Sequence, residues 1–128
     1  MQHNKTLCKM SKRPKFRPSF KFWIELEGKR VIGKGGAAIL EKIKKEGSIS
    51  KAAEKLGMSY RYVWNYLDEM RRTVGEPVVE TFKGGKSGGG GAKLTKLGEY
   101  LLSEYKRISG DMGKFVSSEK VGGEISED

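Results

Sequence analysis

The spacing of apolar residues first indicates a hairpin, in the segment FKFWIELEGKRVIG that begins at residue 20. Up to Leu26 every second residue is apolar, which is the period of a strand with one face buried. Gly28 then allows a tight turn, and Val31 and Ile32 lie in a short return strand. The pattern therefore predicts an N-terminal β-hairpin.

The period changes to that of a helix in GGAAILEKIKKEG, residues 35–47. Ile39, Leu40 and Ile43 fall on one face at the spacing of an amphipathic helix. Lys44 and Lys45, with Gly47 two residues further on, are typical of a helix C-terminus, because glycine accepts the left-handed conformation that ends many helices. We expect one helix here, with its apolar stripe in the core.

The strongest local signal is the segment SISKAAEKLGMSYRYVWNYLDEMRRTVGEP. Ser50 can cap a short helix over residues 51–56, and Gly57 breaks that helix. Ser59 can cap a longer helix over residues 60–73, which the sequence Gly-Glu-Pro ends. Two helices joined by a turn of about three residues that contains glycine form the helix-turn-helix pattern.

The second of these helices divides into two faces when its residues are placed at intervals of about 100°. One face holds the core candidates: Val63, Tyr66, Leu67 and Met70. The opposite face holds residues free to touch a partner: Arg61, Trp64, Asn65 and Asp68, with Ser59 and Tyr60 at the exposed N-terminal end. Trp64 lies at the border of the two faces, so its angle allows either a core position or a contact with the partner.

The segment VVETFKGGKSGGGGAKLT follows directly and predicts a second hairpin. Its tip, residues 83–91, holds six glycines, two lysines and no acid. Lysines can neutralise phosphates, and glycines let backbone N–H groups approach them. A hairpin at this place, directly after a helix-turn-helix, is the wing of a winged helix. The other interpretation is a passive, solvated loop.

The middle of this tip also matches the end of a nucleotide-binding phosphate loop, through Gly85, Lys86 and Ser87. That motif needs another glycine where the chain has Glu80, and a helix directly after the serine. Four glycines follow instead, and they are a poor start for a helix. No catalytic carboxylate pair accompanies the loop, and His3 is the only histidine. We therefore expect no enzyme activity, no catalytic residues and no nucleotide cofactor.

A further amphipathic helix is predicted after Thr95, which can act as its N-cap. Its apolar stripe is Leu97, Leu101, Tyr105 and Ile108, with a weaker continuation to Met112 and Phe115. From Leu101 the spacing alternates between four and three, as in a coiled-coil seam. The stripe is longer than one small core requires, so we expect a dimerisation helix. Gly110 and Gly113 interrupt it, and we expect the helix to weaken near residue 109.

Composition and charge restrict the class of partner. The chain has 128 residues, 36% of them apolar, and a formal net charge of +10. Such an excess of positive charge attracts polyanions, meaning nucleic acid or an anionic membrane. The longest apolar runs are too short to span a membrane, and a single cysteine is typical of an intracellular protein. His3 and Cys8 are too few ligands for a metal site.

Three segments are predicted along the chain. Residues 1–19 form a disordered basic leader, either a solvated tail or an arm that touches phosphates; residues 20–109 form the folded domain; and residues 110–128 form a flexible acidic tail. The predicted fold class is mainly α with a small β component, a winged helix-turn-helix with an N-terminal β-hairpin and a C-terminal dimerisation helix.

Two stretches together resemble a known family: GSISKAAEKLGMSYRYVWNYLDEM and VVETFKGGKSGGGGAKLTKLGEYLL. They are similar to the N-terminal DNA-binding domain of the ModE family, the molybdate-responsive transcription regulators. That domain is a LysR-like winged helix-turn-helix. The resemblance covers about residues 20–109 and rests on G-S-I-S with the following Ala-Ala, on S-Y three residues before V-W, and on the glycine-rich wing.

The resemblance implies a role for each group of candidate residues. The recognition helix 60–73 would lie in the major groove and bind DNA through Ser59, Tyr60, Arg61 and Asn65, to which we add Trp64. The N-terminal end of the preceding helix would lie against phosphates, through Ser48, Ser50 and Lys51. The wing 83–93 would lie on the flanking backbone, through Lys83, Gly84, Gly85, Lys86 and Lys93. ModE-like domains pair through their outer helices, which fits the stripe from Leu97 to Ile108.

Full ModE regulators also carry C-terminal domains that bind molybdate, and this sequence ends at Asp128 without a counterpart. We therefore expect a single-domain, archaeal-type relative that needs no cofactor and binds no molybdate. The expected function is sequence-specific regulation of transcription by a homodimer on double-stranded DNA, in the cytoplasm at the nucleoid. The alternative on the same fold is a non-specific architectural DNA-binding protein. An RNA-binding module is disfavoured, because its usual aromatic and loop motifs are missing.

Overall fold

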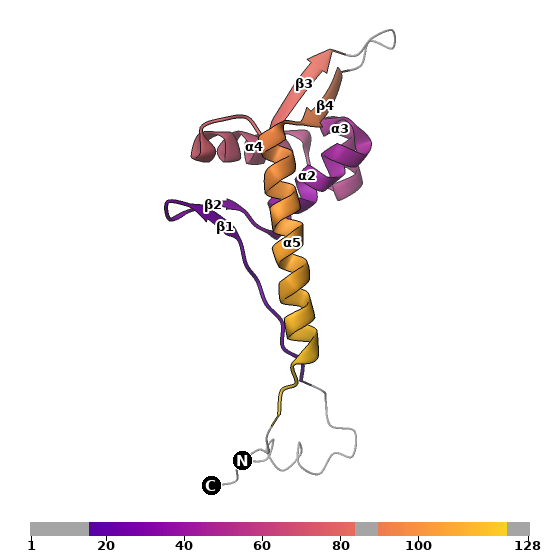
Figure 1. Cartoon of the computed structure of the whole chain (residues 1–128). Coiled ribbons are helices and arrows are strands. Elements are labelled where there is room, and N and C mark those ends of the chain that lie inside the picture. The colour runs from indigo at the N-terminus through magenta and orange to yellow at the C-terminus, as the bar shows by residue number, and fades with distance from the viewer. Residues whose placement is uncertain (1–15, 84–89, 123–128) are drawn as a thin grey trace, which may run out of the picture.

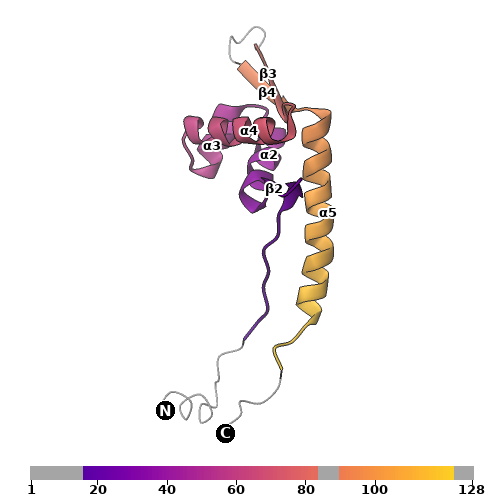
Figure 2. The same ribbon diagram turned by 90° about the vertical axis from the view of Figure 1, so that its left-hand side faces the viewer.

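A cluster of three helices lies between two β-hairpins in the computed structural model, which describes residues 16–83 and 90–122 (Figure 1). In chain order the elements are β1 (Ile24–Leu26), β2 (Lys29–Ile32), α2 (Lys34–Glu46), α3 (Ile49–Leu56), α4 (Tyr60–Val74), β3 (Val79–Lys83), β4 (Gly90–Leu94) and α5 (Lys96–Ser118). The hairpins β1–β2 and β3–β4 are separate antiparallel sheets, and α5 runs beside the cluster and extends beyond it (Figure 2). The predicted winged helix-turn-helix fold is confirmed.

The core lies where α2 meets α3, α4 and the strands β2 and β4. Its completely buried large side chains are Ile32, Ile39, Leu40, Ile43, Val63 and Val78. Three of them form the predicted stripe of α2, which confirms the helical period of that segment. Gly47 ends α2 with a left-handed φ of 75°, and its N–H donates to the carbonyl of Ile43. Among the described residues no polar or charged side chain is buried, so apolar burial stabilises this core.

The N-terminal hairpin is shorter than the sequence predicts. β1 contains only residues 24–26, and Leu26, expected on the buried side, is 41% exposed. The preceding residues leave the hairpin and run beside α5, where Phe22 stacks on Tyr105 with ring centroids 4.6 Å apart. The expected strand over residues 20–23 is therefore wrong, because an aromatic partner on a distant helix replaces the strand pairing.

The N-cap of α3 is Ser48 and not Ser50. Ser48 has an extended backbone, and its hydroxyl accepts the N–H of Lys51 at 2.9 Å. Ser50 lies exposed within the first turn of the helix. The earlier start includes Ile49 in the helix and buries it in the core, a tertiary contact that local capping rules do not register.

We expect replacement of Ser48 by alanine to lower the free energy of unfolding by about 1 kcal/mol, because the N–H of Lys51 would lose its acceptor. Replacement of Ser50 by alanine is the matched control and should change that free energy by less than about 0.5 kcal/mol. Urea unfolding of the two variants measures the difference. If Ser50→Ala proves the more damaging change, the cap has been assigned to the wrong serine.

α5 continues through both of its later glycines to Ser118, so the expectation that it weakens near residue 109 is wrong. Arg107 forms an ion pair with Glu104 at 2.8 Å, one turn earlier, and another with Asp111 at 3.9 Å, which spans Gly110. The hydrogen bond from Arg107 also holds the pKa of the Glu104 carboxyl below its usual value. Met112 and Val116 are half-buried beyond Gly110, and each helical glycine costs about 1 kcal/mol.

Part of the α5 stripe expected to form a dimer interface packs into the core of a single chain. Leu101 and Tyr105 are only 7% and 9% exposed, and both belong to the core cluster. Leu97 packs against that cluster and Ile108 is half-buried. Leu101 and Tyr105 therefore contribute to the core of one chain rather than to a free surface, while Phe115, further along the helix, is 64% exposed.

Candidate nucleic-acid interface

The exposed face of α4, together with its N-cap, holds the contact residues that the sequence predicts for the recognition helix. Ser59 caps the helix as expected, since its hydroxyl accepts the N–H of Tyr62 at 3.0 Å. Tyr60 follows at the first helical position and is half exposed. Arg61 and Asn65 are both exposed and lie four residues apart, about one helical turn. The side-chain donors of this face are therefore accessible from solvent.

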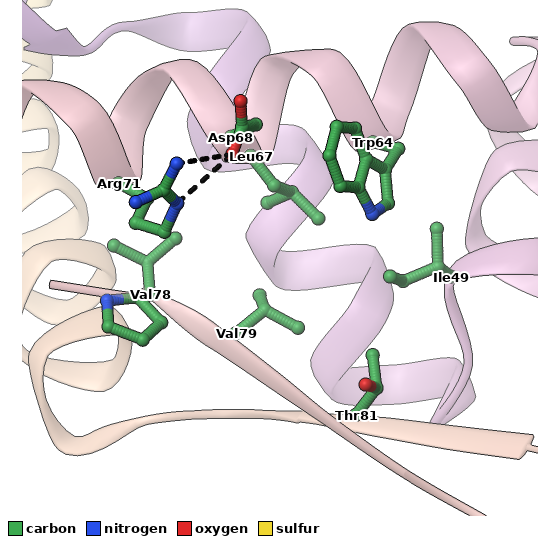
Figure 3. Close-up of a pocket in the computed structure, with 9 residues that line it drawn as sticks. Ile49, Trp64, Leu67, Asp68, Arg71, Val78, Val79 and Thr81 are labelled. Atoms are coloured by element: carbon green, nitrogen blue, oxygen red, sulfur yellow. Dashed lines mark hydrogen bonds and ion pairs between the residues drawn. The ribbon is translucent and has the colours of Figure 1, made fainter.

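Trp64 lies on the surface and not in the core, with 48% exposure. Its indole forms part of the wall of an open groove between α4 and β3, together with Ile49 and Thr81 (Figure 3). Leu67 and Val79 line the same groove with apolar surface. The groove joins the exposed face of α4 to the base of the β3–β4 hairpin, so the two form one continuous surface.

Asp68 holds two arginines of α4, an arrangement that the angular analysis of the sequence missed. Nε of Arg71 donates to its carboxylate at 3.0 Å, and Nε of Arg72 lies 3.6 Å from the second oxygen. The i, i+3 and i, i+4 spacing was the available signal. Arg61 forms no ion pair with any carboxylate in the described residues. The positive charge of α4 is therefore compensated in its C-terminal half and free in its N-terminal half.

The start of α3 presents a smaller polar surface. Ser50 and Lys51 are exposed there, and Ser48 is half-buried with its hydroxyl engaged in the cap. Backbone N–H groups at a helix N-terminus carry the positive end of the helix dipole, which favours anions such as phosphate. Ser50 and Lys51 are thus available for a phosphate, whereas Ser48 mainly orients the helix.

The β3–β4 hairpin carries its two described lysines on opposite faces. Because side chains alternate along a strand, Lys83 shares a face with Val79 and Thr81, which line the groove beside α4. Lys93 lies on the other face, directly across from Glu80. This opposite charge offsets part of the charge of Lys93. The remaining wing candidates lie outside the described residues: Gly84, Gly85 and Lys86.

Hydrogen bonds close the base of this hairpin and join it to the end of α2. The N–H of Thr95 donates to the carbonyl of Val78 at 3.0 Å, and its hydroxyl donates to the carbonyl of Pro77 at 2.9 Å. The N–H of Ala92 donates to the carbonyl of Gly47 at 2.9 Å, which joins β4 to the end of α2. The direction of the hairpin relative to α4 is therefore set by the fold and does not depend on its tip.

In residues 16–83 and 90–122, no group of His, Cys, Asp and Glu side chains could hold a metal ion. None of the helices in this part of the chain is long and apolar enough to cross a membrane. The surface offers instead exposed donors and positive charge on α3, α4 and the hairpin.

Comparison with known proteins agrees with this geometry. Residues 37–99 match the lysR family of bacterial regulatory helix-turn-helix proteins. The molybdenum-pterin-binding protein MopB of Rhodobacter capsulatus is 40% identical over 95 residues, which are 74% of this chain and 34% of MopB. The transcriptional regulator ModE of Yersinia pestis is 44% identical over 72 residues, 56% of this chain and 27% of ModE.

The DNA-binding transcriptional dual regulator ModE of Escherichia coli K12 is 37% identical over 86 residues, 67% of this chain and 32% of that protein. The chain thus spans about a third of the length of these curated relatives. The match of residues 37–99 covers α3, α4 and the β3–β4 hairpin completely. Residues 37–99 are therefore similar to the helix-turn-helix domains of the lysR family, and ModE and MopB proteins are among the relatives of this chain.

Proposed function

We propose that this chain is a sequence-specific DNA-binding transcription regulator that inserts α4 into the major groove. The observation that carries the proposal is the exposed Arg61, free of ion pairs within the described residues, one turn before Asn65 on a lysR-type helix-turn-helix. Arginine can donate two hydrogen bonds to guanine, and asparagine can bond adenine through two atoms. The major groove is wide enough to admit a helix.

Contacts to the sugar-phosphate backbone would fix the position of α4 in the groove. Tyr60 can meet a phosphate or a thymine methyl group from the N-terminal end of the helix. Trp64 is exposed beside the hairpin and offers apolar surface to the same DNA strand that Tyr60 would contact. Ser50 and Lys51 at the start of α3 would bind a neighbouring phosphate, with Ser48 holding that helix end in place.

In the wing, Lys83 is the proposed phosphate contact because it shares a face with the residues that line the groove beside α4. Replacing Lys83 with alanine should weaken binding to all sequences alike and lower the log–log salt slope by about 0.9, the value for one phosphate. The same change at Lys93 should have a smaller effect, since Glu80 lies across from it. Titrations of DNA with each variant at salt concentrations from about 50 to 200 mM measure the slopes.

The two lysine variants control for each other, because both remove one exposed charge from the same hairpin. Equal changes in slope would contradict the assignment of Lys83 to the DNA side. An unchanged slope in both variants would make the hairpin a passive loop. A loss confined to one DNA sequence would instead identify the lysine as a base contact.

We also propose a homodimer that pairs through α5. Because Leu101 and Tyr105 are buried in one chain, the proposed contact uses Leu97, Ile108 and the exposed Phe115. A two-fold axis between the helices would place two copies of α4 about 34 Å apart, or a multiple of that distance, on an inverted repeat.

The dimer predicts the mass in solution and the form of the DNA site. Sedimentation at micromolar concentration should give twice the mass of the chain, and Phe115→Glu should shift the protein towards the monomer. Val121→Glu, at another exposed apolar residue beyond α5, is the control and should leave the mass unchanged. Selection from a random duplex library should enrich an inverted repeat. A monomeric wild type with an unsymmetrical site would contradict the dimer.

The proposed partners are double-stranded DNA and a second copy of this chain, with no cofactor, molybdate or membrane required. A regulator that acts on chromosomal DNA would work at the nucleoid in the cytoplasm. An archaeal origin, expected from the ModE-like resemblance, stays a prediction.

A further inference from the structure

A cavity separate from the groove beside α4 lies between the N-terminal segment and α5. It has a volume of about 390 Å³ and is lined by Phe20, Lys21, Phe22, Trp23, Arg30, Lys34, Tyr105 and Ser109. These residues come from the approach to β1, from β2, from the first position of α2 and from the middle of α5. Figure 1 shows the β1–β2 hairpin beside the middle of α5, whereas the β3–β4 hairpin projects from its start. The volume lies in the range of small-molecule sites.

The lining is strongly positive. Lys21, Arg30 and Lys34 face the cavity, and no carboxylate lines it. None of these three cations forms an ion pair with a carboxylate in the described residues. The nearby Glu25 accepts a hydrogen bond from the indole nitrogen of Trp23 at 2.7 Å. The cavity therefore holds positive charge that no described acid pairs with, and this favours an anionic occupant.

The remaining walls are aromatic and partly stacked. Phe22 lies parallel to Tyr105 at 4.6 Å, and Phe20 follows at 6.3 Å from Phe22. The guanidinium carbon of Arg30 lies 4.9 Å from the centre of the Trp23 ring, which holds its planar charge beside another flat surface. Planar groups stack on such surfaces, and arginine also binds carboxylate and phosphate oxygens through two parallel bonds.

We propose that this cavity binds a small planar aromatic anion, with its ring against the aromatic walls and its carboxylate or phosphate on Arg30 and Lys34. The occupant would connect the N-terminal hairpin, α2 and α5. Because α5 is the proposed dimer helix, binding there is suited to alter the pairing of two chains. The binding itself is independent of the proposed DNA-binding function.

Calorimetric titration of the whole protein tests the proposal with matched probes. Benzoate and adenosine monophosphate carry a ring and a charge, benzyl alcohol carries the ring alone, and acetate and inorganic phosphate carry the charge alone. We expect saturable binding of at least one ring-bearing anion, at least about tenfold tighter than the three partial probes. Whether benzoate or the nucleotide binds tighter identifies the headgroup, carboxylate or phosphate.

Variants assign the binding to the cavity. Lys34→Gln and Arg30→Gln should each weaken binding at least about tenfold. Lys45→Gln, at another exposed lysine of α2 that does not line the cavity, should leave it unchanged. Thermal melts check the fold of each variant, and Lys34 is the safer position because Arg30 packs against Trp23 and Gly33.

Three outcomes would overturn the proposal. One is the absence of saturable binding for both aromatic anions, and another is equal loss of binding in the Lys45→Gln control. The third is loss of the dimer mass in Lys34→Gln without any ligand, which would mean that a second copy of the chain fills the cavity. These titrations contain no DNA, so their results stand even if the protein binds none. The proposal of anion binding and the proposal of DNA binding are therefore tested independently.

Discussion

Alanine in place of Gly98 should lower the free energy of unfolding by about 1–3 kcal/mol, the usual range for overpacking a well-filled site. A Cβ atom at this position would overlap with the carbonyl oxygen of Val78, which is backbone and cannot turn aside. That oxygen also accepts the N–H of Thr95 at 3.0 Å, and Val78 is almost completely buried. The start of α5 and the base of the hairpin would have to separate. Urea unfolding monitored by circular dichroism measures the loss.

Gly110 provides the matched control in the same helix. An alanine Cβ there would meet no atom within 4 Å, and the residue lies in the regular part of α5. Gly110→Ala should therefore raise the free energy of unfolding by up to about 1 kcal/mol, the difference in helix propensity. A stabilising Gly98→Ala would contradict the close packing of α5 against the hairpin base.

Replacing Arg61 with alanine should weaken binding to the preferred DNA site by about 1–3 kcal/mol and relax the base preference at one position. Arg61 is exposed and has no ion-pair partner in the described residues, so its guanidinium is free to bond a base. Folding should change little, because an exposed helical arginine and alanine have similar helix propensities. Competition titrations on the preferred duplex and on single-base variants measure both effects.

Arg71 is the control for this change, since it is exposed on the same helix but hydrogen-bonded to Asp68. Arg71→Ala should alter affinity less and should leave the order of preferred bases unchanged. If Arg61→Ala instead weakens binding equally on every sequence, Arg61 is a phosphate contact and the base-reading role belongs to another residue.

The sequence predicts those parts of the fold that depend on local signals. The stripe of α2, the Ser59 cap and the faces of α4 follow from helical spacing and capping chemistry, and the structure has them as expected. The predictions that are wrong concern segments whose structure is determined by contacts with residues far away in the sequence. Burial of Ile49 accompanies a start of α3 at Ser48, two residues before the expected cap. Phe22 stacks on Tyr105 and takes no part in strand pairing.

The candidate interface shows the same division. The exposure of Arg61 and Asn65 follows from the angle of each residue on α4, which needs no tertiary information. The separation of Lys83 and Lys93 onto opposite faces depends on strand register, which the glycine-rich sequence does not determine. The position of Trp64 could not be settled from its angle, because the hairpin that forms the groove beside it lies further along the chain.

The most direct test of the central claim is the ratio of two dissociation constants at physiological salt. One is measured on the duplex enriched from a random library, and the other on a scrambled duplex of equal length and composition. Sequence-specific recognition by α4 predicts that the enriched duplex binds at least about 10³-fold more tightly. A ratio near one would contradict that claim and would assign the domain to non-specific, architectural DNA binding.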